Sequence, residues 1–162
     1  MNIDCILDTF KRHEVEYILL GGMNFLLRHE PVLTFDIDLW INDTPGNRTR
    51  CEKALIDLDV SWGATDEEWG KATQLKQGWL SRQAMFCLMS PHGAIDIFRR
   101  IKGLDDWVEC AANAVHGKTA GGADYQGLSD ADMLRCQYAL DENQRKLDRI
   151  RVLEEQEKNN DS

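Results

Sequence analysis

The sequence lacks the features of membrane and secreted proteins. No apolar run approaches the roughly 20 residues that a membrane-spanning helix needs, and the first residues, "MNIDCILDTF", contain no basic segment of the kind that begins a signal peptide. It also has no CxxC pair, which argues against a zinc site. The cysteines are odd in number and scattered, as in proteins with reduced thiols, so we expect a cytoplasmic protein with no membrane contact. They are Cys5, Cys51, Cys87, Cys110 and Cys136.

Basic residues are also scarce. There are 19 Lys and Arg against 28 Asp and Glu, a formal net charge of −9. Proteins that bind long nucleic acid generally have a basic surface, so extended nucleic-acid binding is not expected. An acidic balance instead suits a site that collects divalent cations. The 162 residues contain no repeat and no long linker, so we predict a single domain over residues 1–162.

The apolar pattern predicts alternating helices and strands. Residues 15–20 and 32–41 have the composition of buried strands, and the short segment between them has helical character until Pro31. Residues 83–90 and 94–98 predict a hairpin, and a second, smaller hairpin is expected across Gly121 and Gly122. Ser129 with Asp132 resembles a capping box. Helices are predicted over 3–14, 48–60 and 104–115, with a C-terminal helical region over about 129–157 and a frayed tail over 158–162.

Two acids interrupt the second strand, "VLTFDIDLWI". Side chains alternate between the faces of a strand, so Asp36, Asp38 and Trp40 share one face, and the apolar residues from Phe35 onward share the other. The two acids would lie about 7 Å apart at Cα, close enough to reach one metal ion or to bridge two. Their mutual repulsion is costly unless a cation or a proton neutralises it. Alternatively, the pair marks the solvent-exposed face of a half-buried sheet.

A third acid, Asp96, has the same setting in "GAIDIF". If its strand lies beside the first, three carboxylates share one sheet face, as in two-metal sites for phosphoryl or nucleotidyl transfer. One ion would orient a triphosphate. The other would lower the pKa of an acceptor hydroxyl, with Asp96 as ligand and proton acceptor.

Gly21 and Gly22 stand where the first strand gives way to the short helix. Glycine permits positive φ and close approach of a ligand to the backbone. The unpaired amides that begin a helix favour phosphate, so Gly21, Gly22, Met23 and Asn24 are predicted to hold a nucleotide. The alternative is that the glycines form only a turn.

Together, "ILLGG", "FDIDLWI" and "AIDIF" resemble the pattern of the DNA polymerase beta-like nucleotidyltransferase superfamily, over about the first 100 residues. The sequence looks most similar to a small bacterial branch that contains abortive-infection toxin nucleotidyltransferases and small antibiotic nucleotidyltransferases. His29 and "TFDIDL" from Thr34 fit that branch. "QRKLDRIRVL" partly resembles its final helix. The departures are Met23 and Val32, where the branch often has Ala and Arg.

This resemblance implies an α+β fold, a small mixed β-sheet flanked by helices. It also implies a nucleotidyltransferase that uses Mg²⁺ or Mn²⁺, with Asp36, Asp38 and Asp96 as catalytic and metal-binding residues. A nucleoside triphosphate such as ATP would be the donor. The acceptor hydroxyl could belong to a small molecule, an RNA or a protein. The alternatives are a non-catalytic module that binds a nucleotide or a partner, and a toxin held by an antitoxin protein.

Several further residues have two interpretations. Arg99, which follows the third acid closely, and Lys146 in the last helix are expected to contact the nucleotide phosphates, or else to be exposed charges. His29 and Thr34 are expected to shape the glycine loop. Trp40 would either stack on a base or pack in the core.

Overall fold

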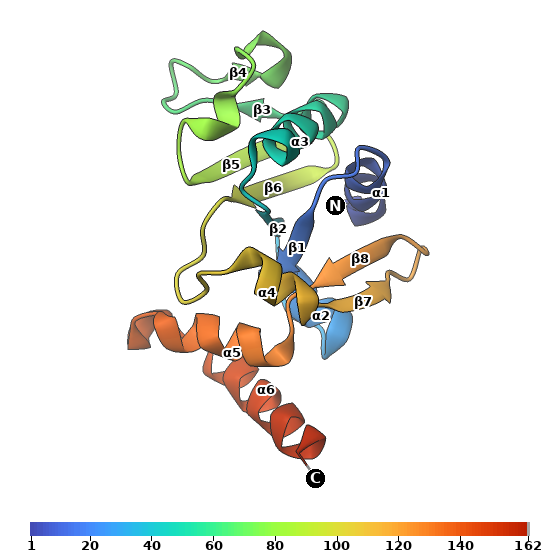
Figure 1. Cartoon of the computed structure of the whole chain (residues 1–162), viewed down its shortest axis with the longest axis vertical. Coiled ribbons are helices and arrows are strands. Elements are labelled where there is room, and N and C mark those ends of the chain that lie inside the picture. The colour runs from blue at the N-terminus through green and yellow to red at the C-terminus, as the bar shows by residue number, and fades with distance from the viewer. Residues whose placement is uncertain (162) are drawn as a thin grey trace.

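The computed structural model describes residues 1–161 and contains one mixed sheet of eight strands (Figure 1). Its strand order is β4-β3-β5-β6-β2-β1-β8-β7. β2 is central, pairing antiparallel with β1 and parallel with β6. The strands are β1 (Tyr17–Leu20), β2 (Asp36–Ile41), β3 (Ser61–Trp62), β4 (Gly70–Lys71), β5 (Met85–Ser90), β6 (Gly93–Phe98), β7 (Val115–Lys118) and β8 (Asp124–Gly127).

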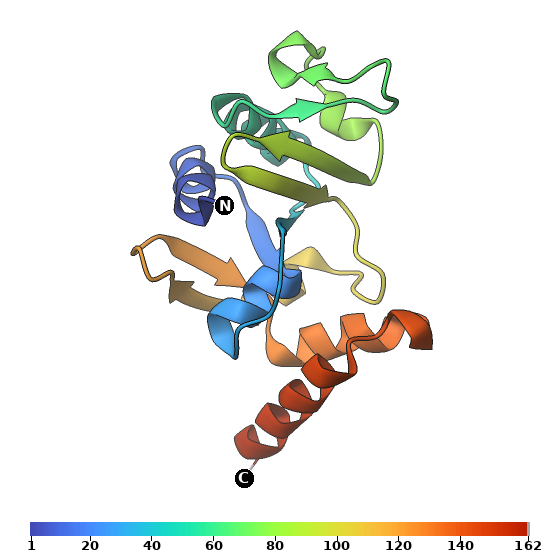
Figure 2. The same cartoon turned by 180° about the vertical axis from the view of Figure 1, so that it is seen from behind.

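Helices cover both faces of this sheet, which confirms the predicted fold class. They are α1 (Ile3–Arg12), α2 (Gly21–Arg28), α3 (Pro45–Asp57), α4 (Trp107–Ala112), α5 (Asp130–Ala139) and α6 (Leu147–Asn160). Short 3-10 turns occur at Ala72–Gln74, Trp79–Ser81 and Glu142–Gln144. Figures 1 and 2 show α5 and α6 at the end of the molecule away from β3 and β4.

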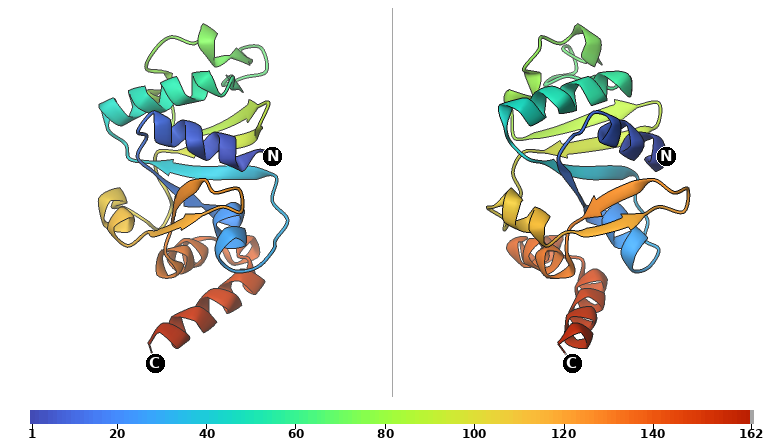
Figure 3. Two further views of the ribbon diagram at one scale, coloured as in Figure 1. Left: turned by 90° about the vertical axis from the view of Figure 1, so that its right-hand side faces the viewer. Right: turned by 45° about the vertical axis from the view of Figure 1, so that its right-hand side comes forward.

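Two apolar cores follow from the strand alternation. On one face, Ile37 and Leu39 of β2 pack with α1 and α3, around residues such as Phe10 and Leu55. On the other face, Trp40 packs with α4, α5 and α6. Figure 3 shows α1 and α3 on the same side of the sheet. The face that carries the acids is therefore the face that the C-terminal helices partly cover.

The predicted second strand was too long at its start. β2 begins at Asp36 rather than at residue 32, and Phe35 is 77% exposed, so its predicted place in the core was wrong. Strand alternation does not apply to Phe35 because the chain joins the sheet only at the next residue, opposite Ala94. The two predicted hairpins are present as β5–β6 and β7–β8.

Several helix boundaries differ from expectation: α3 covers Pro45–Asp57 instead of 48–60, and α4 covers Trp107–Ala112 instead of 104–115. α2 begins at Gly21 itself, so the glycine pair forms the first turn of the helix. α6 continues to Asn160, past the expected end near residue 157, and Ser162 lies outside the described residues. The predicted cap is confirmed, because Ser129 Oγ accepts a hydrogen bond from the Asp132 backbone N–H at 3.2 Å. No helix among residues 1–161 combines the length and apolarity that crossing a membrane requires.

Candidate active site

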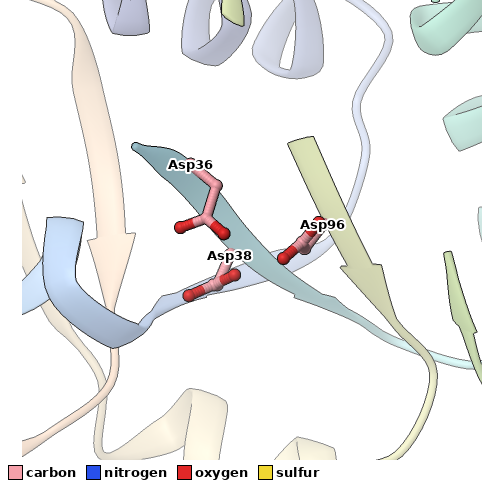
Figure 4. Close-up of side chains that lie close together, drawn as sticks. All are labelled: Asp36, Asp38 and Asp96. Carbon is pink, nitrogen blue, oxygen red and sulfur yellow. The ribbon is translucent and has the colours of Figure 1, made fainter. Parts of the chain in front are cut away.

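Three aspartates converge on one sheet face (Figure 4). Asp38 of β2 lies directly opposite Asp96 of β6 in the parallel register, and Asp36 lies two residues before Asp38 on the same face. One carboxylate oxygen from each acid lies within 4.8 Å of the other two. All three are partly buried. The convergence expected from strand alternation is therefore present, and we refer to these residues as the acidic triad.

The electrostatics of the triad oppose ionisation of all three acids together. The pKa of Asp38 is raised to about 7, mainly because burial disfavours the charged form, and further by Asp36 and Asp96. The pKa of Asp96 is raised to about 6 by burial and by its hydrogen bond and charge contact with Asp36. A bound divalent cation would remove this repulsion. A donor set made only of carboxylate oxygens fits Mg²⁺ or Mn²⁺.

Gly21 is required by the way Asp38 approaches α2. Its φ is +64°, a conformation that favours glycine. A Cβ at this position would lie 2.1 Å from Asp38 Oδ2, which is shorter than any real contact. Gly22 is also confined, because its Cβ would stand 3.1 Å from the Thr34 side chain. The glycine pair thus has a steric reason beyond forming a turn.

The start of α2 is an uncapped helix end beside the triad. Its N-cap residue is Leu20, and no side chain accepts a hydrogen bond from the first turn. The first N–H groups of a helix have no partner within the helix, and they carry partial positive charge. Gly21, the first residue of α2, lies against Asp38, so the amides of this first turn could hold a phosphate beside a metal ion bound by the triad.

Met23 and Asn24 enter this arrangement only through the backbone. Met23 is buried in the core, and its N–H is one of the unpaired amides. The Asn24 side chain is fully buried, and its Nδ2 donates to the Leu128 carbonyl at 3.1 Å and to Met133 Sδ at 3.2 Å. These side chains position α2 against the segment that leads into α5, and they do not reach the triad.

Arg99 and Lys146, the two predicted phosphate contacts, lie elsewhere. Arg99 follows the end of β6, and its guanidinium donates to Asp43 at 2.9 Å and to the carbonyl of Gln83 at 3.1 Å. Arg99 therefore connects the loop that follows β2 with the segment that precedes β5. Lys146 is exposed at the start of α6. Its backbone N–H donates to Gln137 Oε1 at 2.8 Å. The structure brings neither side chain to the triad.

Arg149 takes the place expected for those cations, and the sequence reasoning missed it. It lines one pocket together with Gly21 and Asp38. Its Nη2 lies 3.4 Å from where a Cβ of Gly22 would stand. Its guanidinium packs over the Phe25 ring at 5.7 Å, and its charge acts to lower the pKa of Asp38. Within residues 1–161 it has no carboxylate at ion-pair distance.

A signal for Arg149 exists in the sequence. Arg149 stands four residues before Leu153 in α6, so the two share one face of the helix. Leu153 is buried in the core beneath α5 and α6. An arginine on the buried face of a helix next to an acidic site is a candidate ligand for an anion.

Thr34 lies against Gly22 as the sequence predicts, whereas His29 acts at the other end of α2, away from the glycine loop. His29 Nε2 lies 2.8 Å from Asp130 Oδ1, and Arg28 contacts the same carboxylate at 2.9 Å, with all three side chains largely buried. This cluster ties the end of α2 to the start of α5. Thr34 Oγ1 donates to the Asp36 carbonyl at 3.2 Å. Trp40 is buried, and its Nε1 donates to a backbone carbonyl, so it packs rather than offering a face to a base.

On the side of the triad away from α2 lies β5, a strand that has no charged side chain. Cys87 of β5 lies directly across from Asp96, and Met85 and Met89 share its sheet face. All three are exposed. Burial raises the pKa of the Cys87 thiol, and the charge of Asp96 raises it further. The triad thus has two different neighbours. On one side are the amides of α2 and the Arg149 guanidinium, and on the other side is the exposed, largely apolar strand β5.

Comparison with known proteins supports the fold. No protein-family model matches the sequence, and no functionally curated protein does. A solved structure from Thermotoga maritima, described as a candidate nucleotidyltransferase, is similar over 94% of this chain and 86% of its own. The TM-score is 0.53 and the sequence identity is 18%, so the likeness concerns the nucleotidyltransferase fold.

Proposed function

We propose that this chain is a magnesium-dependent nucleotidyltransferase that moves a nucleoside monophosphate from a nucleoside triphosphate to an acceptor hydroxyl. The observation that carries the proposal is the contact between the acidic triad and the free amide end of α2, made possible by Gly21. Metal ligands and phosphate-binding amides thus lie side by side. The similarity to a nucleotidyltransferase fold supports this interpretation.

Asp36, Asp38 and Asp96 would hold the metal ions, Mg²⁺ or Mn²⁺. When bound, these ions would neutralise the triphosphate and lower the pKa of the attacking hydroxyl. The chain itself contributes the raised pKa values of Asp38 and Asp96, which keep the triad partly protonated and limit repulsion while no cation is bound.

The donor would bind on the α2 side. The unpaired N–H groups at Gly21, Gly22 and Met23 would donate hydrogen bonds to the terminal phosphates, and the Arg149 guanidinium would add charge-assisted hydrogen bonds. Phosphoryl transfer depends chiefly on positioning and charge stabilisation, and both are built into this side of the site.

The acceptor would approach from the β5 side. Its hydroxyl oxygen would attack the α-phosphorus as the bond from that phosphorus to the bridging oxygen of the leaving pyrophosphate breaks. Asp96 faces this side, directly opposite Cys87 of β5, so its carboxylate would be placed to receive the hydroxyl proton. The pyrophosphate would leave from the amides of α2, in line with the incoming oxygen.

The side chains of β5 limit the classes of acceptor that would fit the site. Met85, Cys87 and Met89 provide apolar surface and no cation, and long nucleic acid is bound mainly through basic side chains. A small molecule or a protein hydroxyl therefore fits better than extended RNA. The role of a toxin with an antitoxin partner stays a prediction. A cytoplasmic location is also a prediction, and the five unpaired cysteines among residues 1–161 agree with it.

A purely non-catalytic module is less favoured by the structure. The departures that suggested it were Met23 and Val32. The Met23 side chain is in the core, and Val32 packs against the second apolar core. Neither belongs to the triad or to the pocket beside it.

The test measures nucleotide binding and transfer together. Wild-type protein with Mg²⁺ is expected to bind nucleoside triphosphates and to transfer α-labelled monophosphate to a component of a small-molecule or protein acceptor pool. Asp36→Ala and Asp38→Ala should abolish transfer. Asp66→Ala is the control, because Asp66 is exposed in the loop between β3 and β4 and lies outside the triad. Transfer that continues unchanged in both triad variants would overturn the proposal.

A further inference from the structure

A second feature of the α2 side is a small apolar pocket between the sheet and the last two helices, called here the α5–α6 pocket. Its walls include Phe25, Phe98, Met133 and Leu153, and its polar lining residues include Gln137 and Arg149. It opens beside Gly21 and Asp38. The pocket therefore adjoins the site proposed for the triphosphate but has a different chemical character.

The size of the pocket limits what it can hold. Its volume is about 190 Å³, below the roughly 300–1,000 Å³ typical of sites for whole drug-sized ligands. It can take one planar ring system but not a complete nucleotide. Phe25 and Phe98 supply aromatic surface, and Met133 supplies a polarizable sulfur that favours contact with rings.

The direction of the reaction decides which substrate enters the pocket. In an in-line displacement the acceptor oxygen and the leaving pyrophosphate lie on opposite sides of the α-phosphorus. The amides of α2 and Arg149 mark the pyrophosphate side, and the pocket opens on that same side. The acceptor is therefore placed toward β5, and the ring that fills the pocket belongs to the donor.

Gln137 has a defined orientation at this pocket. Its Oε1 accepts a hydrogen bond from the Lys146 backbone N–H at 2.8 Å. Only the oxygen of a carboxamide can accept, so this bond distinguishes Oε1 from Nε2. The Nε2 group, which carries two N–H donors, is left for a ligand. A donor at this position pairs with a base carbonyl and is mismatched with an exocyclic amino group.

We propose, resting on the proposed function, that the α5–α6 pocket binds the nucleobase of the donor and that Gln137 selects bases with a carbonyl where adenine and cytosine carry an amino group. The preferred donors are then GTP and UTP rather than ATP and CTP. One neutral hydrogen bond gained or lost corresponds to about a tenfold difference in affinity.

The experiment is calorimetry on the full chain with Mg²⁺, using the non-hydrolysable α,β-methylene analogues of the four nucleoside triphosphates and inorganic tripolyphosphate. Tripolyphosphate reports the phosphate site alone. We expect the GTP and UTP analogues to bind about tenfold more tightly than the ATP and CTP analogues, and all four to exceed tripolyphosphate.

Two substitutions sharpen this test. Gln137→Glu replaces the free donor with an acceptor, so the preference should shift toward the ATP and CTP analogues while tripolyphosphate binding changes little. Gln144→Glu is the matched control, since Gln144 is exposed in the turn before α6 and does not line the pocket. A thermal melt of each variant confirms that it is folded.

The outcomes separate the two proposals. If tripolyphosphate and the analogues bind in a way that Asp38→Asn abolishes, but all four bases bind equally and Gln137→Glu leaves them equal, the inference about the pocket is overturned and the proposed function stands. If neither tripolyphosphate nor any analogue binds, both are overturned.

Discussion

The Asp38 carboxylate lies directly against Gly21, in the space that the Cβ of any other residue would occupy. A Cβ on Gly21 would stand 2.1 Å from Asp38 Oδ2. The residues come from different elements, β2 and the start of α2, and they join the metal-binding and the phosphate-binding halves of the proposed site.

This contact predicts a specific effect of Gly21→Ala. The positive φ and the clash with Asp38 should together destabilise the fold by about 1–3 kcal/mol and should weaken tripolyphosphate binding with Mg²⁺. Gly122→Ala is the control, because Gly122 also has a positive φ, +92°, but has open space around its Cβ position. Urea denaturation and calorimetry measure both effects. If the two variants had the same free energy of unfolding and the same affinity for tripolyphosphate, the contact with Asp38 would be unimportant.

The raised pKa of Asp38 predicts an unusual pH dependence of stability. The folded pKa is about 7, above the ordinary value of 3.8, so between these values the folded protein holds a proton that the unfolded chain releases. The metal-free protein should therefore lose stability as pH rises from 5 to 8, by about 1–3 kcal/mol. Asp96, with its pKa raised to about 6, acts in the same direction.

Urea denaturation in the presence of a chelator at pH 5, 6, 7 and 8 measures this slope. Asp38→Asn should make this slope smaller, because the uncharged amide cannot titrate and only the contribution of Asp96 remains. Added Mn²⁺ or Mg²⁺ should stabilise the protein more at pH 8 than at pH 5, since protons compete for the same oxygens. A stability that rises steadily from pH 5 to 8 without metal would contradict the prediction.

Arg149 rather than Lys146 is predicted to bind the phosphates. Arg149→Ala should reduce the affinity for tripolyphosphate by about tenfold or more, because a charge-assisted hydrogen bond is worth about 1.5–3 kcal/mol. Lys146→Ala removes an exposed cation from the same helix and should change it less than about twofold. Calorimetry compares the two variants directly. If Lys146→Ala had the larger effect, the assignment of the α6 cation would be wrong.

Cys87 should report the charge state of the triad. Its pKa is raised by burial and by Asp96, Asp36 and Asp38, so neutralising these acids with a divalent cation should increase the thiolate fraction. Alkylation by iodoacetamide at pH 8 should then be severalfold faster with saturating Mg²⁺. Cys87 is the exposed cysteine of the described chain, and Cys87→Ser identifies the background rate. A rate independent of metal in wild-type protein would count against cation binding at the triad.

Local patterns in the sequence were enough to identify the acids and the glycines. The alternation in "FDIDLWI" and "AIDIF" predicts a polar face for Asp36, Asp38 and Asp96, and the structure confirms that they meet. The same rule failed for Phe35, because alternation holds only where the chain is already paired in the sheet. The predicted contacts of Arg99 failed because the strand ends before it and Asp43 binds its side chain.

The sequence by itself determined which faces the side chains of β2 and β6 occupy, because the two-residue period of a strand is a property of the local backbone. Only the tertiary structure decided that these strands pair in parallel with Asp38 opposite Asp96, that Gly21 lies against Asp38, and that α6 presents Arg149. These relationships join residues that are far apart in the chain. They depend on how whole elements pack, which no local periodicity specifies.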